Sequence, residues 1–141
     1  MMIELLRGRV EAGEGDASKW LSLFNAEYSI KLGMPVFPGS LNVRLDQPFD
    51  WLAPRYQQGI IQFGRREYGG ERDILLLRCV LASLGRRRAF IWHSIHPTLG
   101  VGMAGTVEIV ADVHLRDTYR LTDGMFVEIE LDLSSAGEGH S

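Results

Sequence analysis

Alternation of apolar and polar residues with a period of two is the feature that most restricts the fold of this chain. Between residues 107 and 115 every odd-numbered position is apolar, whereas Glu108, Asp112 and His114 occupy even-numbered positions. Residues 127–133 repeat the pattern, with acidic residues at the even positions. Because successive side chains of a β-strand point to opposite faces, the pattern predicts two strands that each bury one face.

Five further segments have the composition of strands and are separated by turns that contain glycine. They comprise residues 3–10, 41–45, 60–63, 74–81 and 89–95. Asp123 and Gly124 form a dipeptide that accepts positive φ in a tight turn, and they mark the entry to the last strand. Seven short strands with polar faces would leave exposed edges in an open sheet. We therefore expect a mainly β fold, in which the sheet closes into a single small β-barrel.

A helical pattern is found in one stretch only, residues 17–31. The apolar residues near one stripe of this helix are Trp20, Leu21, Leu23, Phe24 and Tyr28. Ser18 is placed to cap its start. The sequence therefore predicts one short helix and a low helix content.

The length of 141 residues is near the commonest size of a single domain, which needs no disulfide or metal for stability. We expect this domain to span residues 1–133, because residues 134–141 are small and polar and predict a flexible C-terminal tail. The chain has 15 lysines and arginines against 18 acidic residues, a net charge of -3. This balance disfavours nucleic acid as a partner. A monomer is compatible with the composition.

Cys79 is the single cysteine, and it lies in the apolar run 74–81, which predicts a buried thiol. The N-terminus lacks the apolar stretch of a signal peptide, and no run approaches the roughly 20 apolar residues that a membrane span requires. These observations predict a cytoplasmic, reducing location and no membrane partner.

A glycine-rich stretch, residues 8–18, joins the first predicted strand to the predicted helix. Glycines let the backbone approach an anion closely, and the N–H groups at the start of a helix point toward it. The stretch therefore predicts a phosphate-binding loop. Glu14 and Asp16 would repel phosphate unless they turn away or act through a cation, so a plain turn is the alternative.

A Pro-Gly turn at residues 38 and 39 leads into a strand on which Ser40 and Asn42 share one face. Their hydroxyl and amide oxygens can contact Mg²⁺ if phosphate oxygens and water supply the remaining ligands. The alternative is that both side chains hydrogen-bond the backbone of the turn.

Glu108 lies on the polar face of a predicted strand, and Arg116 and Asp117 follow near its end. An acid on such a face is usually solvated, and an Arg-Asp pair there is usually a weak surface ion pair. If the face lines a cleft, the Glu108 carboxylate can accept a proton from a substrate hydroxyl. His93 and His96 are not spaced to complete a zinc site, and the arginines at 86–88 are either a solvated turn or a guide for an anionic ligand.

These stretches, in this order, resemble the CTP-dependent riboflavin kinases first known from archaea. The family motif G-x-V-x-x-G-x-G is matched by Gly8, Val10, Gly13 and Gly15. Its most specific element, P-G-[ST]-L-N-[VL], is matched at residues 38–43. Residues 108–111 and 115–117 echo an E-I-I-A-P-like strand followed by L-R-[ED], and residues 121–127 match L-x-D-G-x-x-V. The resemblance spans nearly the whole chain.

The resemblance implies a single six-stranded cradle-loop barrel that transfers the γ-phosphate of CTP to the 5′-hydroxyl of riboflavin, giving FMN and CDP, with Mg²⁺ as cofactor. The implied nucleotide-binding residues are Gly13, Glu14, Gly15, Asp16, Ala17, Ser18, His114, Leu115, Arg116 and Asp117. The implied metal contacts are Ser40 and Asn42, the implied flavin contacts are Thr98 and Glu108, and the implied catalytic residues are Glu108 and Asn42. For this to hold, the three stretches must converge around one cavity.

The chain departs from the family pattern in the glycine-rich loop, where Ala17 and Ser18 replace a glycine and a basic residue. Asp112 stands where the family usually has proline. The first departure motivates a second hypothesis, a barrel that binds flavin or nucleotide without phosphoryl transfer. A third hypothesis, a DNA-binding barrel of the swapped-hairpin type, rests on the Asp-Gly strand entry alone and is opposed by the acidic balance.

Overall fold

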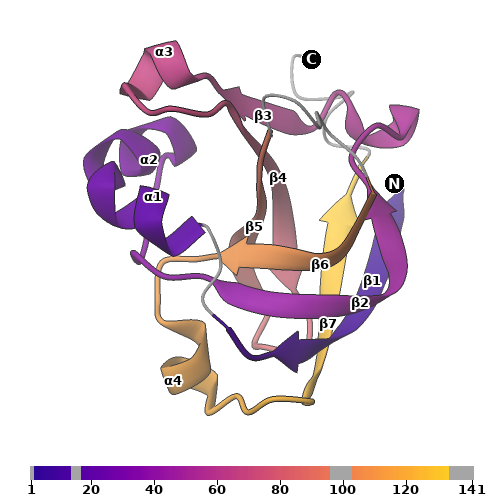
Figure 1. The fold of residues 1–141 in the computed structure, drawn as a ribbon. Coiled ribbons are helices and arrows are strands. Elements are labelled where there is room, and N and C mark those ends of the chain that lie inside the picture. The colour runs from indigo at the N-terminus through magenta and orange to yellow at the C-terminus, as the bar shows by residue number, and fades with distance from the viewer. Residues whose placement is uncertain (1, 14–16, 96–102, 134–141) are drawn as a thin grey trace.

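Seven antiparallel strands form one sheet that closes into a barrel (Figure 1). The structure is a computed structural model, and it describes residues 2–13, 17–95 and 103–133. The strands are β1 (Ile3–Glu11), β2 (Leu41–Asp50), β3 (Ile60–Phe63), β4 (Ile74–Leu81), β5 (Arg87–Ser94), β6 (Met103–Val110) and β7 (Phe126–Asp132). Their order in the sheet is β3-β4-β5-β6-β2-β1-β7, and β4 also pairs with β7.

The additional pairing of β4 with β7 makes a closed barrel of six strands. One edge of β4 pairs with β5, and two strands share the other edge. From Ile74 to Leu77 this second edge pairs with β3. The other half, at Val80 and Leu81, pairs with β7. Strand β3 is therefore an addition outside the closed ring. The predicted fold class, a mainly β protein with a small six-stranded barrel, is confirmed.

The period-two pattern places its apolar residues inside this barrel. Val107, Ile109, Val127 and Ile129 are all buried in one core cluster, whereas the acidic residues between them are only partly buried or exposed. Burial of such side chains contributes about 1.5–3 kcal/mol each. The apolar faces of the predicted strands are therefore the main source of the barrel's stability.

Strands β4 and β5 are covered on both faces, which accounts for the continuous apolar run in β4. A second core cluster lies between these strands and the helices, and it includes Trp20, Tyr28, Leu76 and Trp92. The Trp92 indole N–H donates a hydrogen bond to the Tyr28 hydroxyl at 3.0 Å. Helices therefore pack on the outside of one barrel wall and leave the other strands free to carry polar faces.

The helices differ from the prediction of a single short one. The structure describes α1 (Ala17–Leu23), α2 (Asn25–Leu32), a 3-10 turn (Pro54–Tyr56), α3 (Arg65–Tyr68) and α4 (Leu115–Tyr119). The predicted helix over residues 17–31 is two helices, because Phe24 between them has a non-helical backbone with ψ of 35°. Leu23 was expected in the apolar stripe and is exposed instead.

The strand predicted over residues 107–115 is displaced toward the N-terminus, because β6 begins at Met103 and ends earlier than expected. Strand β6 ends at Val110, and α4 begins at Leu115. Ala111 and Leu115 are nevertheless buried in the barrel core. Odd-numbered residues therefore continue to be buried after the strand ends, because the chain that follows β6 still directs their side chains into the core.

The remaining predictions concern the cysteine, the C-terminal tail and membrane-spanning segments. Cys79 is buried and unpaired, as expected, and burial raises the pKa of its thiol. Residues 134–141, expected to be a flexible tail, lie outside the described residues. In the part of the chain that the structure describes, no helix is long and apolar enough to cross a membrane.

Candidate active site

The Glu108 carboxylate is the point at which three distant segments meet. Its Oε1 atom accepts a hydrogen bond from the backbone N–H of Ala17 at 2.9 Å and one from the Ser40 hydroxyl at 3.0 Å. These residues come from β6, the start of α1 and the segment just before β2, and Figure 1 shows α1 beside the end of β6. Two donors on one oxygen orient the carboxylate.

Strand register brings Asn42 into the same group. Asn42 on β2 lies directly opposite Glu108 on β6 and, on its other side, opposite Glu11 on β1. The Asn42 side-chain nitrogen donates a hydrogen bond to the Gly13 carbonyl at 3.0 Å. The end of β1 and the start of the glycine-rich loop are therefore held against β2 beside Glu108.

Gly13 has a backbone conformation that favours glycine. Its φ is 120°, a value that side-chain-bearing residues rarely adopt. A Cβ atom at this position would meet only the Asn42 side chain, at 3.6 Å. The glycine is therefore needed for its φ angle and not for space.

The described parts of the glycine-rich loop, β2 and β6 converge as expected, and the cavity expected around them stays a prediction. Ser40, Asn42 and Glu108 lie together, next to Gly13 and Ala17. Other predicted site residues, namely Glu14, Gly15, Asp16 and Thr98, lie outside the described residues. Hydrogen-bonding partners separated by up to 91 residues in sequence thus form one polar group on the outer face of the barrel.

The start of α1 is not capped as the sequence predicted. The Glu108 carboxylate accepts the N–H of Ala17, the first residue of α1, whereas Ser18 lies within the helix. Ala17 is fully buried and adopts the helical conformation, so its methyl group is accommodated at this position. Ser18 is partly buried and contributes no charge.

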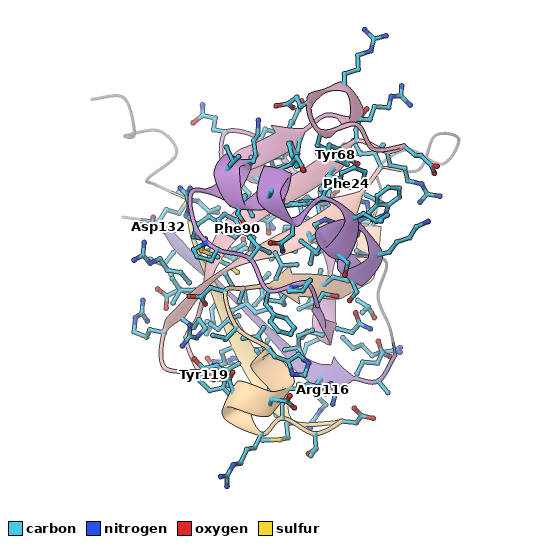
Figure 2. The ribbon with its side chains drawn as sticks, turned by 90° about the vertical axis from the view of Figure 1, so that its left-hand side faces the viewer. Phe24, Tyr68, Phe90, Arg116, Tyr119 and Asp132 are labelled. Carbon is cyan, nitrogen blue, oxygen red and sulfur yellow. The ribbon has the colours of Figure 1, made fainter. Side chains whose placement is uncertain are left out.

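The segment predicted to face the nucleotide divides into inward and outward residues. Leu115 is buried in the barrel core, so its side chain is a packing residue. His114 Nδ1 lies 2.7 Å from Asp117 Oδ2, and the His114 ring lies 5.0 Å from that of Phe37. Arg116 lies on α4, at the end of the molecule opposite Phe24 and Tyr68 (Figure 2).

Three residues near the site were not identified by sequence reasoning. The Thr106 hydroxyl donates to Glu11 Oε2 at 2.8 Å, and the Arg44 guanidinium lies 3.5 Å from Glu11 Oε1. A signal was present, since Thr106 is two residues before Glu108 and Arg44 is two after Asn42, on the same strand faces. The polar group therefore continues along the outer face of β1, β2 and β6.

Asp112 forms an ion pair with Arg87 at 2.7 Å. Arg87 Nε also donates to the Tyr119 hydroxyl at 2.6 Å, and these two hydrogen bonds raise the pKa of the Arg87 guanidinium. Arg86 pairs with Glu130 at 3.1 Å. Two of the three arginines at positions 86–88 are thus engaged in ion pairs at the turn between β4 and β5.

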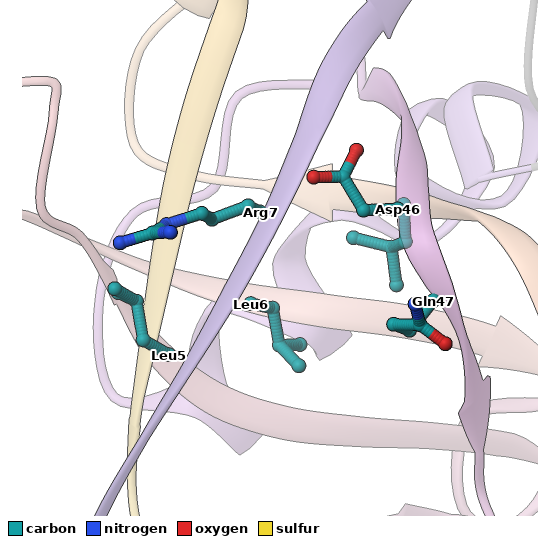
Figure 3. A pocket seen from close by; sticks show the side chains of 6 residues that line it. Leu5, Leu6, Arg7, Asp46 and Gln47 are labelled. Carbon is teal, nitrogen blue, oxygen red and sulfur yellow. The ribbon is translucent and has the colours of Figure 1, made fainter.

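A surface cavity of about 480 Å³ lies between β1 and β2, at the end away from Glu11 and Asn42 (Figure 3). The ladder between these strands stops at the pair Gly8 and Leu45, and Pro48, which lacks an N–H, follows in β2. The lining residues are Leu5, Leu6, Arg7, Leu45, Asp46 and Gln47. None of them belongs to the polar group around Glu108.

A family model for CTP-dependent riboflavin kinases, also described as domain of unknown function DUF120, matches residues 10–131 of this chain. Riboflavin kinase of Methanocella arvoryzae is 31% identical over 134 residues, which cover 91% of this chain and 57% of that protein. Riboflavin kinase of Methanothermobacter thermautotrophicus is 30% identical, with 89% of this chain and 96% of that protein covered. For the riboflavin kinase of Staphylothermus marinus the identity is 29%, with 88% of each chain covered. The chain thus spans little more than half of the first relative and nearly all of the second.

Proposed function

The chain belongs to the family of CTP-dependent riboflavin kinases, and we propose that it transfers the γ-phosphate of CTP to the 5′-hydroxyl of riboflavin, giving FMN and CDP. The observation that carries this proposal is the grouping of Glu108, Ser40 and Asn42 at the start of the glycine-rich loop. Phosphoryl transfer depends mainly on alignment of the nucleophile with phosphorus and on neutralisation of the phosphate oxygens. The hydrogen-bonded polar group beside Gly13 supports the proposal on the first requirement.

In this proposal Glu108 orients the riboflavin hydroxyl. The carboxylate is held by the Ser40 hydroxyl and the Ala17 N–H, both on Oε1. A carboxylate fixed in this way accepts a hydrogen bond from the attacking hydroxyl, and it takes the proton as the new phosphorus–oxygen bond forms. Because a loose transition state needs little early removal of the proton, orientation is the larger part of this role. Thr98 is proposed as the second flavin contact.

The nucleotide is assigned to the segments on either side of Glu108. The proposed phosphate-binding residues are Gly13, Glu14, Gly15, Asp16, Ala17 and Ser18, and the proposed segment facing the cytidine is residues 114–117. The Gly13 backbone is fixed by Asn42, which sets where the loop begins. A fixed start reduces the ordering that binding of phosphate by this loop would require.

Ser40 and Asn42 are proposed to hold Mg²⁺ through their side-chain oxygens. Ser40 is hydrogen-bonded to Glu108, and Asn42 is hydrogen-bonded to Gly13 of the glycine-rich loop. The side-chain atoms proposed as metal ligands are hard oxygen atoms. Among the described residues no three His, Cys, Asp or Glu side chains cluster to form a closed metal cage. This donor set fits Mg²⁺, which usually keeps water and substrate phosphates as ligands. When bound, the ion neutralises charge on the phosphate oxygens.

The test is formation of FMN by the purified protein from riboflavin, Mg²⁺ and each nucleoside triphosphate in turn. We expect FMN with CTP as the preferred donor, and a loss of about 100-fold or more in kcat for Glu108→Gln, the scale expected for a positioned acid or base. No FMN with any donor would reject kinase activity.

A barrel that only binds flavin or nucleotide is the second candidate, favoured by Ala17 and Ser18 in the loop. This candidate predicts that the protein quenches flavin fluorescence on binding but forms no FMN, which distinguishes it from the kinase. A gain of FMN formation in the double variant Ala17→Gly with Ser18→Arg would identify an eroded kinase. The cytoplasmic location, the monomeric state and the domain limits stay predictions.

A further inference from the structure

Arg116 joins the start of α4 to two other segments, namely the end of β1, 105 residues earlier, and the turn before β7, seven residues later. Its Nη2 atom donates a hydrogen bond to the Glu11 backbone carbonyl at 3.0 Å and lies 2.7 Å from Asp123 Oδ1. Arg116 is in the first turn of α4, Glu11 ends β1, and Asp123 belongs to the turn before β7. One guanidinium therefore fastens α4 and this turn to the strand that leads into the glycine-rich loop.

The end of β1 is held on this side by backbone hydrogen bonds as well. The Val10 N–H donates to the Met125 carbonyl at 2.9 Å, and the Gly124 N–H donates to the Val10 carbonyl at 2.8 Å. On the other side, Asn42 holds the Gly13 carbonyl. The start of the loop is thus held from both sides, by Asn42 of β2 on one side and by the turn before β7 and Arg116 on the other. We call this set of contacts the clamp.

The charge of Arg116 is already balanced by the carboxylate of Asp123. Their side chains are about one-third and more than one-half exposed, at 32% and 58%. A guanidinium that has a carboxylate partner and a backbone carbonyl partner is oriented toward the protein. This arrangement does not present Arg116 as an unpaired cation to a phosphate.

We propose that Arg116 is a positioning residue for the nucleotide, which acts by fixing the start of the glycine-rich loop relative to α4 and not by contact with phosphate. The inference rests on the proposed function, because it assigns the nucleotide to these two segments. Loss of the clamp weakens binding of the nucleotide in the ground state and the transition state alike. It therefore raises KM for CTP and leaves kcat nearly unchanged.

The sign of the effect at Asp123 separates this role from a direct contact. If Arg116 acts through position, Asp123→Asn loosens the guanidinium and raises KM for CTP. If Arg116 instead contacts phosphate by its charge, the same variant removes a competing carboxylate and lowers that KM. Arg116→Lys distinguishes the two roles again, because a lysine keeps the charge but lacks the planar fork that bonds both partners.

Steady-state kinetics of four variants form the first experiment. We expect Arg116→Gln and Arg116→Lys to raise KM for CTP about tenfold, the scale of one charged hydrogen bond, and Asp123→Asn to raise it by a smaller factor. The double variant Arg116→Gln with Asp123→Asn should match Arg116→Gln alone, because both changes break one clamp. KM for riboflavin should stay constant. A lysine variant that behaves as wild type, together with a lower KM in Asp123→Asn, would overturn the proposal.

Amide hydrogen exchange gives a second measurement that does not depend on catalysis. Arg116→Gln should speed exchange at residues 10–13, whereas Arg86→Gln, which breaks the matched surface ion pair with Glu130, should not. Unchanged exchange in Arg116→Gln would contradict the clamp even if the protein proved to be a kinase. Absence of FMN formation by wild type would reject the proposed function, and the exchange result would still decide the role of Arg116 in the loop.

Discussion

At the scale of single residues, one carboxylate supports both local structure and the proposed chemistry. Glu108 accepts the first amide of α1, and the same oxygen accepts the Ser40 hydroxyl. The sequence motif indicated Glu108, Ser40 and Asn42 as site residues. It did not indicate that Glu108 would take the capping role predicted for Ser18, because that contact crosses from one strand to a helix 91 residues earlier.

Removal of the Ser40 hydroxyl tests the orientation of Glu108. Ser40→Ala should lower kcat/KM for riboflavin by roughly tenfold or more, because a hydrogen bond to a charged group contributes about 1.5–3 kcal/mol. Ser83→Ala is a matched control, since the Ser83 hydroxyl accepts a hydrogen bond from the Glu128 N–H far from this group. Ser40→Thr should retain most activity. Equal kinetics for Ser40→Ala and wild type would contradict the role.

Burial of His93 predicts a pH dependence of stability. Its ring stacks on Trp51 with 5.2 Å between centroids, and desolvation lowers the pKa of His93 below its ordinary value of 6.5. Below this pH the unfolded chain binds a proton that the folded state resists, so the free energy of unfolding falls as pH decreases. Thermal unfolding at pH 7.5 and 5.5 should show that stability decreases less at the lower pH in His93→Phe than in wild type. An equal loss in both proteins would show that other groups cause it.

At the scale of elements, the site depends on the close approach of β1 and β2. Their register places Glu11 opposite Asn42, and the register of β2 with β6 places Asn42 opposite Glu108. The alternating pattern predicted most strand positions closely, because burial on one face requires a period of two. The same pattern predicted that the strand continues beyond Val110, which is wrong. Inward-facing residues still alternate with outward-facing ones in the segment between β6 and α4, so the pattern does not distinguish this segment from a strand.

Gly8 permits this approach of the two strands. A Cβ atom at Gly8 would clash with the Arg44 carbonyl oxygen and lie 2.7 Å from Val43 Cγ1, whereas one at Gly105 of β6 would meet nothing within 4 Å. We expect Gly8→Ala to lower the free energy of unfolding by about 1–3 kcal/mol or more. Gly105→Ala should be neutral or raise it by up to about 1 kcal/mol. Denaturant titration measures both, and similar values for the two variants would contradict the account.

At the scale of the whole molecule, closure of the sheet decides which residues can meet. Pairing of β4 with β7 joins the two ends of the six-stranded ring, so every strand of the barrel has a neighbour on each side. The core inside the ring includes Cys79, which is 1% exposed. Closure therefore creates both the buried interior and the outer polar face that carries Glu108.

The thiol of Cys79 reports on this closure. Burial raises its pKa and removes it from solvent, so the reactive thiolate is not available in the folded protein. A water-soluble thiol reagent at pH 8 should label the native protein only at the rate of unfolding, and should label it fully in denaturant. Rapid stoichiometric labelling without denaturant would show that the wall formed by β4 opens.

The sequence by itself determined most of the strands and the buried faces, and its resemblance to a family indicated Ser40, Asn42 and Glu108, which the structure brings together. These depend on side-chain periodicity and on short motifs, which are properties of neighbouring residues. Only the tertiary structure decided that Phe24 divides the predicted helix, that Leu115 faces the core and that Arg116 holds Glu11 and Asp123. The reason is physical: the packing of Phe24 on Tyr68, the burial of Leu115 and the contact of Arg116 with Glu11 join segments that are distant in the chain. These partners come within reach only when strand register and barrel closure bring the segments together.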